Sequence, residues 1–113
     1  ETWSKPWPID ILNPNSQTDI LCLENGHLIL ACNPGIRGVG GKGRGELSLF
    51  RSIDNGKTWD KPNKFIIEED PPNEYSYPCL IQTTNGKIHL SYTYKRQSIA
   101  HCVMTEEECF PTE

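Results

Sequence analysis

The sequence predicts an all-β chain of short antiparallel strands, on three observations. The apolar stretches are short, and the 113 residues include nine glycines and nine prolines. Helical periodicity is absent, whereas several segments, most clearly 88–94, alternate apolar and polar residues as a half-buried strand does. Asn-Gly pairs at 25–26, 55–56 and 85–86 mark tight turns between such segments. We therefore expect strands joined by hairpins.

The expected elements follow one another along the chain with short connections. Strands are expected over 7–12, 19–24, 27–32, 46–50, 64–67, 75–82, 87–94 and 98–104. The first is an outer strand that tolerates Pro8, because an edge strand need not donate every ladder bond. Residues 33–45 carry six glycines without periodicity, and such a loop usually lies over a binding face. Residues 68–73 read as an acidic connector and 105–113 as an acidic tail.

These elements group into three parts of one segment, 1–113. A trailing outer strand occupies 1–12, one complete four-stranded unit occupies 18–68, and three strands of another unit occupy 75–104. The fourth strand of that last unit is not visible in the sequence.

Composition excludes two classes of partner. Eleven basic and fifteen acidic residues give a net charge of −4, and no Lys/Arg block is present, so we expect no nucleic acid partner. No apolar run approaches the roughly 20 residues that a membrane span needs, and no signal peptide is visible. The compartment is left open, since secretion and a cytoplasmic location both agree with this sequence.

The five cysteines are expected to be free thiols that act as small hydrophobes. A two-residue turn at Asn25-Gly26 would pair Cys22 with Ile29 and place Cys22 and Cys32 on opposite faces. Cys79 and Cys102 would also lie on opposite faces. Disulfides stay an alternative.

No metal and no cofactor are expected, because no Cys-x-x-Cys or His pair has ligand spacing in the sequence. His89 and His101 are interpreted as packed polar residues on neighbouring strands.

The octet 52–59 is the most specific motif. Ser52, Asp54, Gly56, Thr58 and Trp59 fit the pattern Ser-x-Asp-x-Gly-x-Thr-Trp. The short polar side chains can accept from nearby backbone N–H groups, the Asn-Gly pair supplies positive φ angles, and the tryptophan buries a large ring beneath the turn. This pattern is similar to the Asp-box that recurs in sialidase (neuraminidase) β-propellers. It marks a fold rather than an activity.

Two further features extend the resemblance to nearly the whole chain. Glu1-Thr2-Trp3 looks like the tail of an earlier Asp-box, and the 56 positions from Trp3 to Trp59 approach the ~40–50 residues of a propeller blade. Residues 73–94, with Asn13-Pro14-Asn15-Ser16 and Asn33-Pro34, resemble the C-terminal portion of the sialidase-like Asp-box (BNR) repeat family. The resemblance implies about two antiparallel four-stranded blades of a six-bladed β-propeller, with the remaining blades of the same propeller as partners.

The resemblance also implies site residues. Sialidases hold the substrate carboxylate with three arginines and use a tyrosine nucleophile with a glutamate partner and an aspartate acid/base. Arg44, eight residues before Ser52, has the position of a carboxylate-binding arginine, and Arg37 is its rival. Tyr75, in the pair Tyr75-Ser76, has the position of the nucleophile, although a phenol with a pKa near ~10 needs arginines and a carboxylate base around it.

Simpler interpretations stay open beside these roles. Arg44 also fits a solvated loop cation, Tyr75 fits an amphipathic residue at the start of a strand, and Tyr92 and Tyr94 fit core aromatics. The sequence departs from the sialidase pattern at Tyr77-Pro78 and lacks the usual acidic residue after Thr93-Tyr94.

Two functions are therefore expected. In the first, the chain is part of an exo-sialidase-type glycoside hydrolase that acts on a terminal acidic sugar, a glycan or sialoside-like substrate. The chain alone would be inactive, because the acid/base aspartate, the glutamate and two arginines would belong to earlier blades. The alternative is a non-catalytic propeller module that binds carbohydrate or protein. A third option is a small β domain that self-associates to rebuild the ring.

Overall fold

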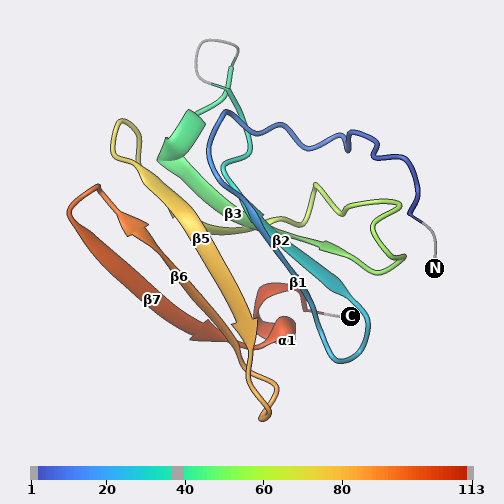
Figure 1. Ribbon diagram of the computed structural model, residues 1–113. Coiled ribbons are helices and arrows are strands. Elements are labelled where there is room, and N and C mark those ends of the chain that lie inside the picture. The colour runs from blue at the N-terminus through green and yellow to red at the C-terminus, as the bar shows by residue number, and fades with distance from the viewer. Residues whose placement is uncertain (1–2, 37–39, 112–113) are drawn as a thin grey trace.

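The computed structural model describes residues 3–36 and 40–111 and confirms the all-β prediction. Two antiparallel sheets contain the seven strands of this described part (Figure 1). The first sheet has the order β1 (Asp19–Cys22), β2 (Leu28–Cys32), β3 (Glu46–Ser52), β4 (Phe65–Glu69). The second has the order β5 (Tyr75–Gln82), β6 (Ile88–Tyr94), β7 (Ser98–Met104). Each sheet thus follows chain order, as the blade of a propeller does.

The hairpin turns differ from the expected two-residue type. The N–H of Leu23 donates to the carbonyl of His27 at 2.8 Å, and the loop between them has three residues. Gly26 takes φ +91°, and Gly86 repeats the arrangement in the second sheet with φ +82°. This is a turn closed by a glycine bulge, in which the left-handed residue costs least when it is glycine.

The extra turn residue corrects the predicted register. Cys22 pairs with Leu28 rather than Ile29, so Cys22 and Cys32 lie on the same face of the sheet and the expectation of opposite faces was wrong. Cys79 and Cys102 do lie on opposite faces, because Leu80, Leu90 and Cys102 form one cross-strand row. All five thiols are free, as expected, but only Cys32 and Cys109 are buried.

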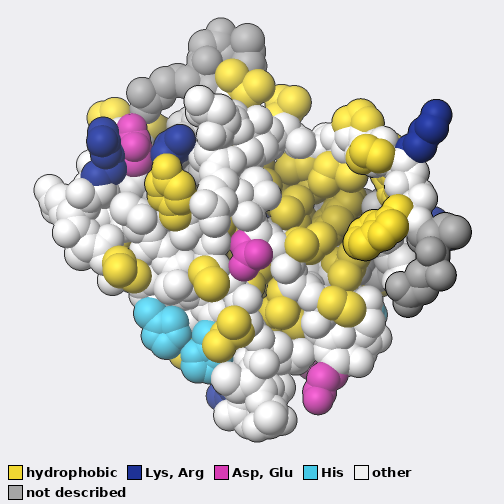
Figure 2. Space-filling view, in the orientation of Figure 1, with side chains coloured by type: hydrophobic (Ala, Val, Ile, Leu, Met, Phe, Trp, Pro, Cys, Tyr) yellow, Lys and Arg dark blue, Asp and Glu magenta, His cyan; other side chains and the backbone are white. Residues whose placement is uncertain are grey.

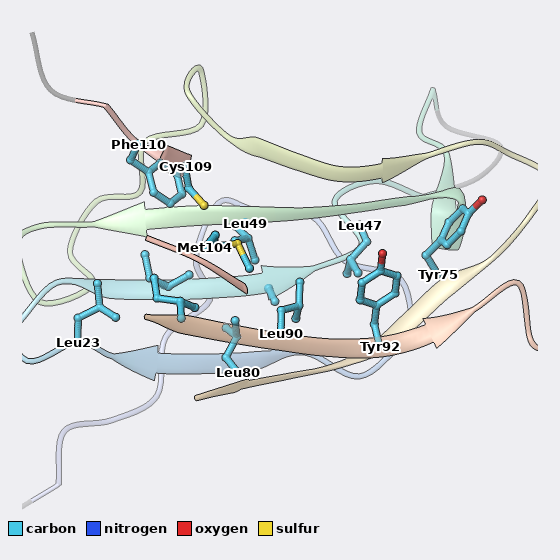
Figure 3. Packing of buried hydrophobic residues seen from close by; sticks show 13 residues of the cluster. Leu23, Leu47, Leu49, Tyr75, Leu80, Leu90, Tyr92, Met104, Cys109 and Phe110 are labelled. Carbon is cyan, nitrogen blue, oxygen red and sulfur yellow. The ribbon is translucent and has the colours of Figure 1, made fainter. Parts of the chain in front are cut away.

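The two sheets pack face to face through one hydrophobic core. Both sheets and the C-terminal segment contribute to it (Figure 3). Leu49 of the first sheet and Leu90 of the second are fully buried at its centre. A smaller cluster covers the opposite face of the first sheet, where Leu30, Cys32 and Phe50 pack against Trp59 and Ile11.

The two ends of the chain depart from the expectations. No strand forms over 3–12, where Pro6 and Pro8 have no N–H to donate to a ladder. At the other end, the expected tail contains the short helix α1 (Glu106–Cys109), because Thr105 and Glu108 form a reciprocal capping box. Phe110, directly after α1, is buried in the core. None of the helices in the described part is long and apolar enough to cross a membrane.

Candidate functional site

The predicted site residues Arg44 and Tyr75 lie at the same end of the sheets. Arg44 belongs to the short 3-10 helix η1 (Gly43–Gly45), which leads directly into β3, and Tyr75 is the first residue of β5. Figure 1 shows η1 beside the start of β5, and residues of the two elements are in contact. The loops 13–16 and 33–36 reach the same end.

Asn33 holds these loops together from a fully buried position. Its amide nitrogen donates to the carbonyl oxygens of Glu46 and Tyr75, both at 2.7 Å, and so joins the two sheets. Its amide oxygen accepts from the hydroxyl of Ser16 at 2.8 Å, and its backbone N–H donates to Asn13 Oδ1 at 3.2 Å. The motifs at 13–16 and 33–34 therefore act through one residue, which sequence reasoning did not single out.

A hollow of about 270 Å³ opens beside Arg44. We call it the Arg44 pocket; Pro14, Ile36, Gly43, Arg44, Gly45 and Glu74 line it. One cation and one carboxylate therefore face the same small space, between walls made of backbone and apolar side chains.

A close approach of backbone shapes the floor of the Arg44 pocket. A Cβ atom added at Gly45 would lie 2.7 Å from Cβ of Pro71, on the connector that leads into β5. Only glycine allows the start of β3 to approach that connector so closely. Arg44 and Glu74 are brought to one pocket by this packing.

Tyr77 is a further residue at this site that the sequence analysis did not assign. The β5–β6 register shifts between Ser76 and Cys79, which leaves Tyr77 and Pro78 in a bulge, and Tyr77 takes φ +57°. Bulges commonly re-aim a side chain next to a functional site, and a bulky residue at positive φ is strained. The Tyr77 ring is 51% exposed, and Cζ of Arg44 lies 5.6 Å from its centroid. Pro78 inside a strand pattern was the signal for this bulge.

Tyr75 occupies a closed environment. Its ring is buried at 1% exposure and packs edge-on against Tyr94 with centroids 5.5 Å apart. Its hydroxyl donates to Asp70 Oδ2 at 3.2 Å. Burial, followed by the negative charge of Asp70, raises the pKa of Tyr75 to about 12. Figure 3 places Tyr75 with Tyr92 at one end of the core, away from Phe110.

Tyr92 repeats this arrangement on the neighbouring strand. Its hydroxyl donates to Glu68 Oε2 at 2.6 Å, and burial together with that carboxylate raises the pKa of Tyr92 above its usual value. The acidic connector thus supplies carboxylate partners to both phenols. Both pKa values are raised, and a raised pKa opposes formation of the phenolate in this arrangement.

The other predicted residues fall into two groups. Arg37 lies outside the described residues. The Asp-box lies at the far end of β3 from Arg44, and a seven-residue strand places the two roughly 20 Å apart. The octet therefore serves the fold and does not touch the Arg44 pocket.

The Asp-box has the internal bonding that the motif predicts. Asp54 Oδ1 accepts from Ser52 Oγ at 2.8 Å and from the N–H of Thr58 at 2.9 Å. Asp54 Oδ2 accepts from Thr58 Oγ1, and the N–H of Gly56 donates to Ser52 Oγ at 2.8 Å. Trp59 packs beneath the turn on the second hydrophobic cluster.

Residues 3–36 and 40–111 contain no group of three or more His, Cys, Asp or Glu side chains placed to hold a metal ion.

The comparisons with known proteins agree with the motif. The family model described as the BNR repeat-like domain matches residues 1–90, which include the Asp-box and both turns with glycine bulges. No curated protein and no solved structure matches the chain significantly.

Proposed function

Because this chain belongs to the BNR repeat-like domain family, we propose that it is the acidic-sugar-binding part of a sialidase-like β-propeller. The observation that carries the proposal is the Arg44 pocket, where a guanidinium held against the Tyr77 ring shares a small hollow with Glu74. The remaining blades of the same propeller would complete the binding face.

The chemistry of the pocket suits a single sugar that carries a carboxylate. The guanidinium of Arg44 can donate two parallel hydrogen bonds to that carboxylate, and it keeps its charge at every accessible pH. Glu74 is an acceptor for sugar hydroxyls, and the exposed Tyr77 ring offers an apolar face to the C–H groups of a pyranose. A volume of about 270 Å³ is close to the small end of ligand sites, on the scale of one monosaccharide.

Hydrolysis is the second candidate function, and the Tyr75–Asp70 hydrogen bond favours it. In this proposal Asp70 takes the phenol proton, in place of the glutamate that the sialidase resemblance implies, while Tyr75 attacks the anomeric carbon and the bond to the aglycone breaks. The leaving oxygen would take its proton from the acid/base aspartate of another blade, and water would then hydrolyse the glycosyl-tyrosine bond. The buried ring would first have to open toward the pocket. A binding module without turnover needs no such movement, and this is why binding stands first.

The test of binding uses methyl α-sialoside as the probe, with saturation-transfer NMR and a neutral methyl galactoside as comparator. We expect the sialoside to bind and Arg44→Ala to weaken it by about tenfold or more, the loss of one charged hydrogen-bonding partner. Arg44→Lys should recover part of the affinity because it restores the charge without the planar fork.

Lys87→Ala is the matched control, since Lys87 is exposed in the turn between β5 and β6. Equal binding of both sugars, or an Arg44→Ala variant that binds as tightly as the unchanged chain, would contradict the proposal. The hydrolytic candidate is tested separately with a fluorogenic sialoside. The chain alone is expected to give no turnover, and turnover that Tyr75→Phe abolishes would move hydrolysis to first place.

A further inference from the structure

Two histidines meet on the face of the second sheet that points away from the core. His89 on β6 pairs with Val103, and His101 on β7 pairs with Ser91, so the two side chains are diagonal neighbours on one face. Their rings stack with centroids 5.2 Å apart and an interplanar angle of 18°. Nδ1 of His89 lies 3.1 Å from Nε2 of His101. Figure 2 shows neighbouring histidine side chains on this surface, beside exposed hydrophobic ones.

The distance between the two nitrogens fits a shared metal ion. Imidazole nitrogens bind zinc at about 2.0–2.1 Å, so two of them at adjacent positions of a tetrahedral or square site lie roughly 3 Å apart. Both nitrogens belong to side chains that solvent can reach. Without an ion, one nitrogen must carry a proton and donate to the other, which fixes one tautomer.

The surroundings of the pair also suit such an ion. Cys79 is exposed on the same face, in the cross-strand row of Ser91 and His101, but it is not placed as a third ligand of the pair. Ile81 and Val103 flank His89 in the adjacent row, and both are about half exposed. A rigid three-stranded sheet holds both imidazoles, so little conformational entropy is lost when they bind one ion.

We propose that His89 and His101 form a two-imidazole site for a divalent transition-metal ion such as Zn²⁺ or Ni²⁺. The remaining coordination positions belong to water, because the described residues form no third-ligand cluster. Imidazole selects these ions over Mg²⁺ and Ca²⁺, which prefer oxygen. The site is independent of the proposed sugar binding, since His89 lies at the start of β6 and Tyr75 pairs with Tyr94 at its end.

The experiment measures binding of Zn²⁺ to the chain by calorimetry in a buffer without imidazole or thiols. We expect one ion per chain and no heat of binding with Mg²⁺. His89→Asn and His101→Asn should each weaken Zn²⁺ binding by about 100-fold, because either change turns a chelate into a single contact. Both residues lie on the outer sheet face, so circular dichroism should show an unchanged fold.

His27→Asn is the matched control, because the third histidine lies in the first hairpin and contacts Glu106 instead. It should leave Zn²⁺ affinity unchanged, and so should Cys79→Ser. Paramagnetic Ni²⁺ should broaden amide NMR signals around residues 89 and 101 first. The proposal fails if either histidine variant keeps full affinity, if His27→Asn weakens binding equally, or if Cys79→Ser alone abolishes it.

Discussion

Short polar side chains organise the backbone of this protein at single positions. Asp54 uses both carboxylate oxygens within its own octet, and Asn33 uses its whole amide across two sheets. The first bonds are local and can be read from the motif. The second set joins residues up to 42 positions apart, so no sequence pattern displays it.

Asp54→Asn should destabilise the chain and reduce the pH dependence of its stability. Hydrogen bonds from Thr58 and Ser52 lower the pKa of Asp54 from 3.8 to about 2. The ionised carboxylate therefore stabilises the fold fully above about pH 4, and this contribution is lost as the pH falls toward 2. Urea midpoints at pH 6 and pH 3 should show a larger difference between the two chains at pH 6.

Glu24→Gln, at an exposed position of the first turn, controls for the general effect of removing a negative charge. If the urea midpoints of the unchanged chain and of Asp54→Asn differed by the same amount at both pH values, the assigned role of the carboxylate would be contradicted.

At the scale of elements, α1 fastens the second sheet to the first. Its first residue, Glu106, accepts from Nδ1 of His27 at 2.5 Å, from Asn25 Nδ2 at 2.7 Å and from Arg51 Nη1 at 3.0 Å. The guanidinium of Arg51 also lies 5.1 Å from the centroid of the Phe110 ring. A helix of four residues has little stability of its own, so these contacts and the buried Phe110 determine its position.

Glu106→Gln should lower the free energy of unfolding by about 2 kcal/mol, because it removes charged hydrogen bonds at a largely covered site. Burial raises the pKa of Glu106, but His27, Asn25 and Arg51 outweigh it and hold the pKa below its usual 4.5. The stabilisation is thus complete above about pH 5 and declines as the pH falls below the unfolded value. Chemical denaturation at pH 7 and pH 4 measures both effects.

Glu107→Gln is the neighbouring control, since Glu107 is exposed, and it should change stability by less than about 0.5 kcal/mol. A similar loss in both variants would assign the effect to the net charge of the segment and not to the contacts of Glu106.

At the scale of the whole molecule, one core serves both sheets, so we expect them to unfold as a single cooperative unit. Residues of β2, β3, β5 and β6 contribute to the same cluster, as Figure 3 shows. Destabilising one sheet should therefore loosen the other.

Leu90→Ala should cost about 3 kcal/mol, since Leu90 is fully buried between the sheets. Hydrogen exchange should then show β2 and β6 amides losing protection by the same amount. Ile99→Ala, at a side chain 79% exposed, should leave protection unchanged. A loss of amide protection confined to β6 would indicate that the sheets unfold independently.

Local patterns were sufficient for most of the strands. Alternation and Asn-Gly turns located the seven strands of the two sheets, and the octet located the Asp-box. They gave the wrong turn length, because a glycine bulge adds a residue that the Asn-Gly pair does not reveal. They also predicted a strand over 7–12 that lacks a ladder partner within the described chain, and they missed the capping box that starts α1.

The candidate site was less accessible to sequence reasoning. The family resemblance implied that Arg44 and Tyr75 share one site, but the bulge presents Tyr77 to the guanidinium and leaves Tyr75 buried beside Asp70. The distance between two nitrogens on neighbouring strands depends on register, so His89 and His101 gave no ligand spacing in the sequence.

The sequence alone determined the all-β class, the order of the hairpins and the family, because these depend on side chains within a few residues of one another. The tertiary structure decided the Asn33 junction, the Arg44 pocket, the closed environment of Tyr75 and the histidine pair. The first three depend on how the two sheets and their loops face one another, and the histidine pair depends on the register of neighbouring strands. A register shift of one residue exchanges the faces of every side chain on a strand.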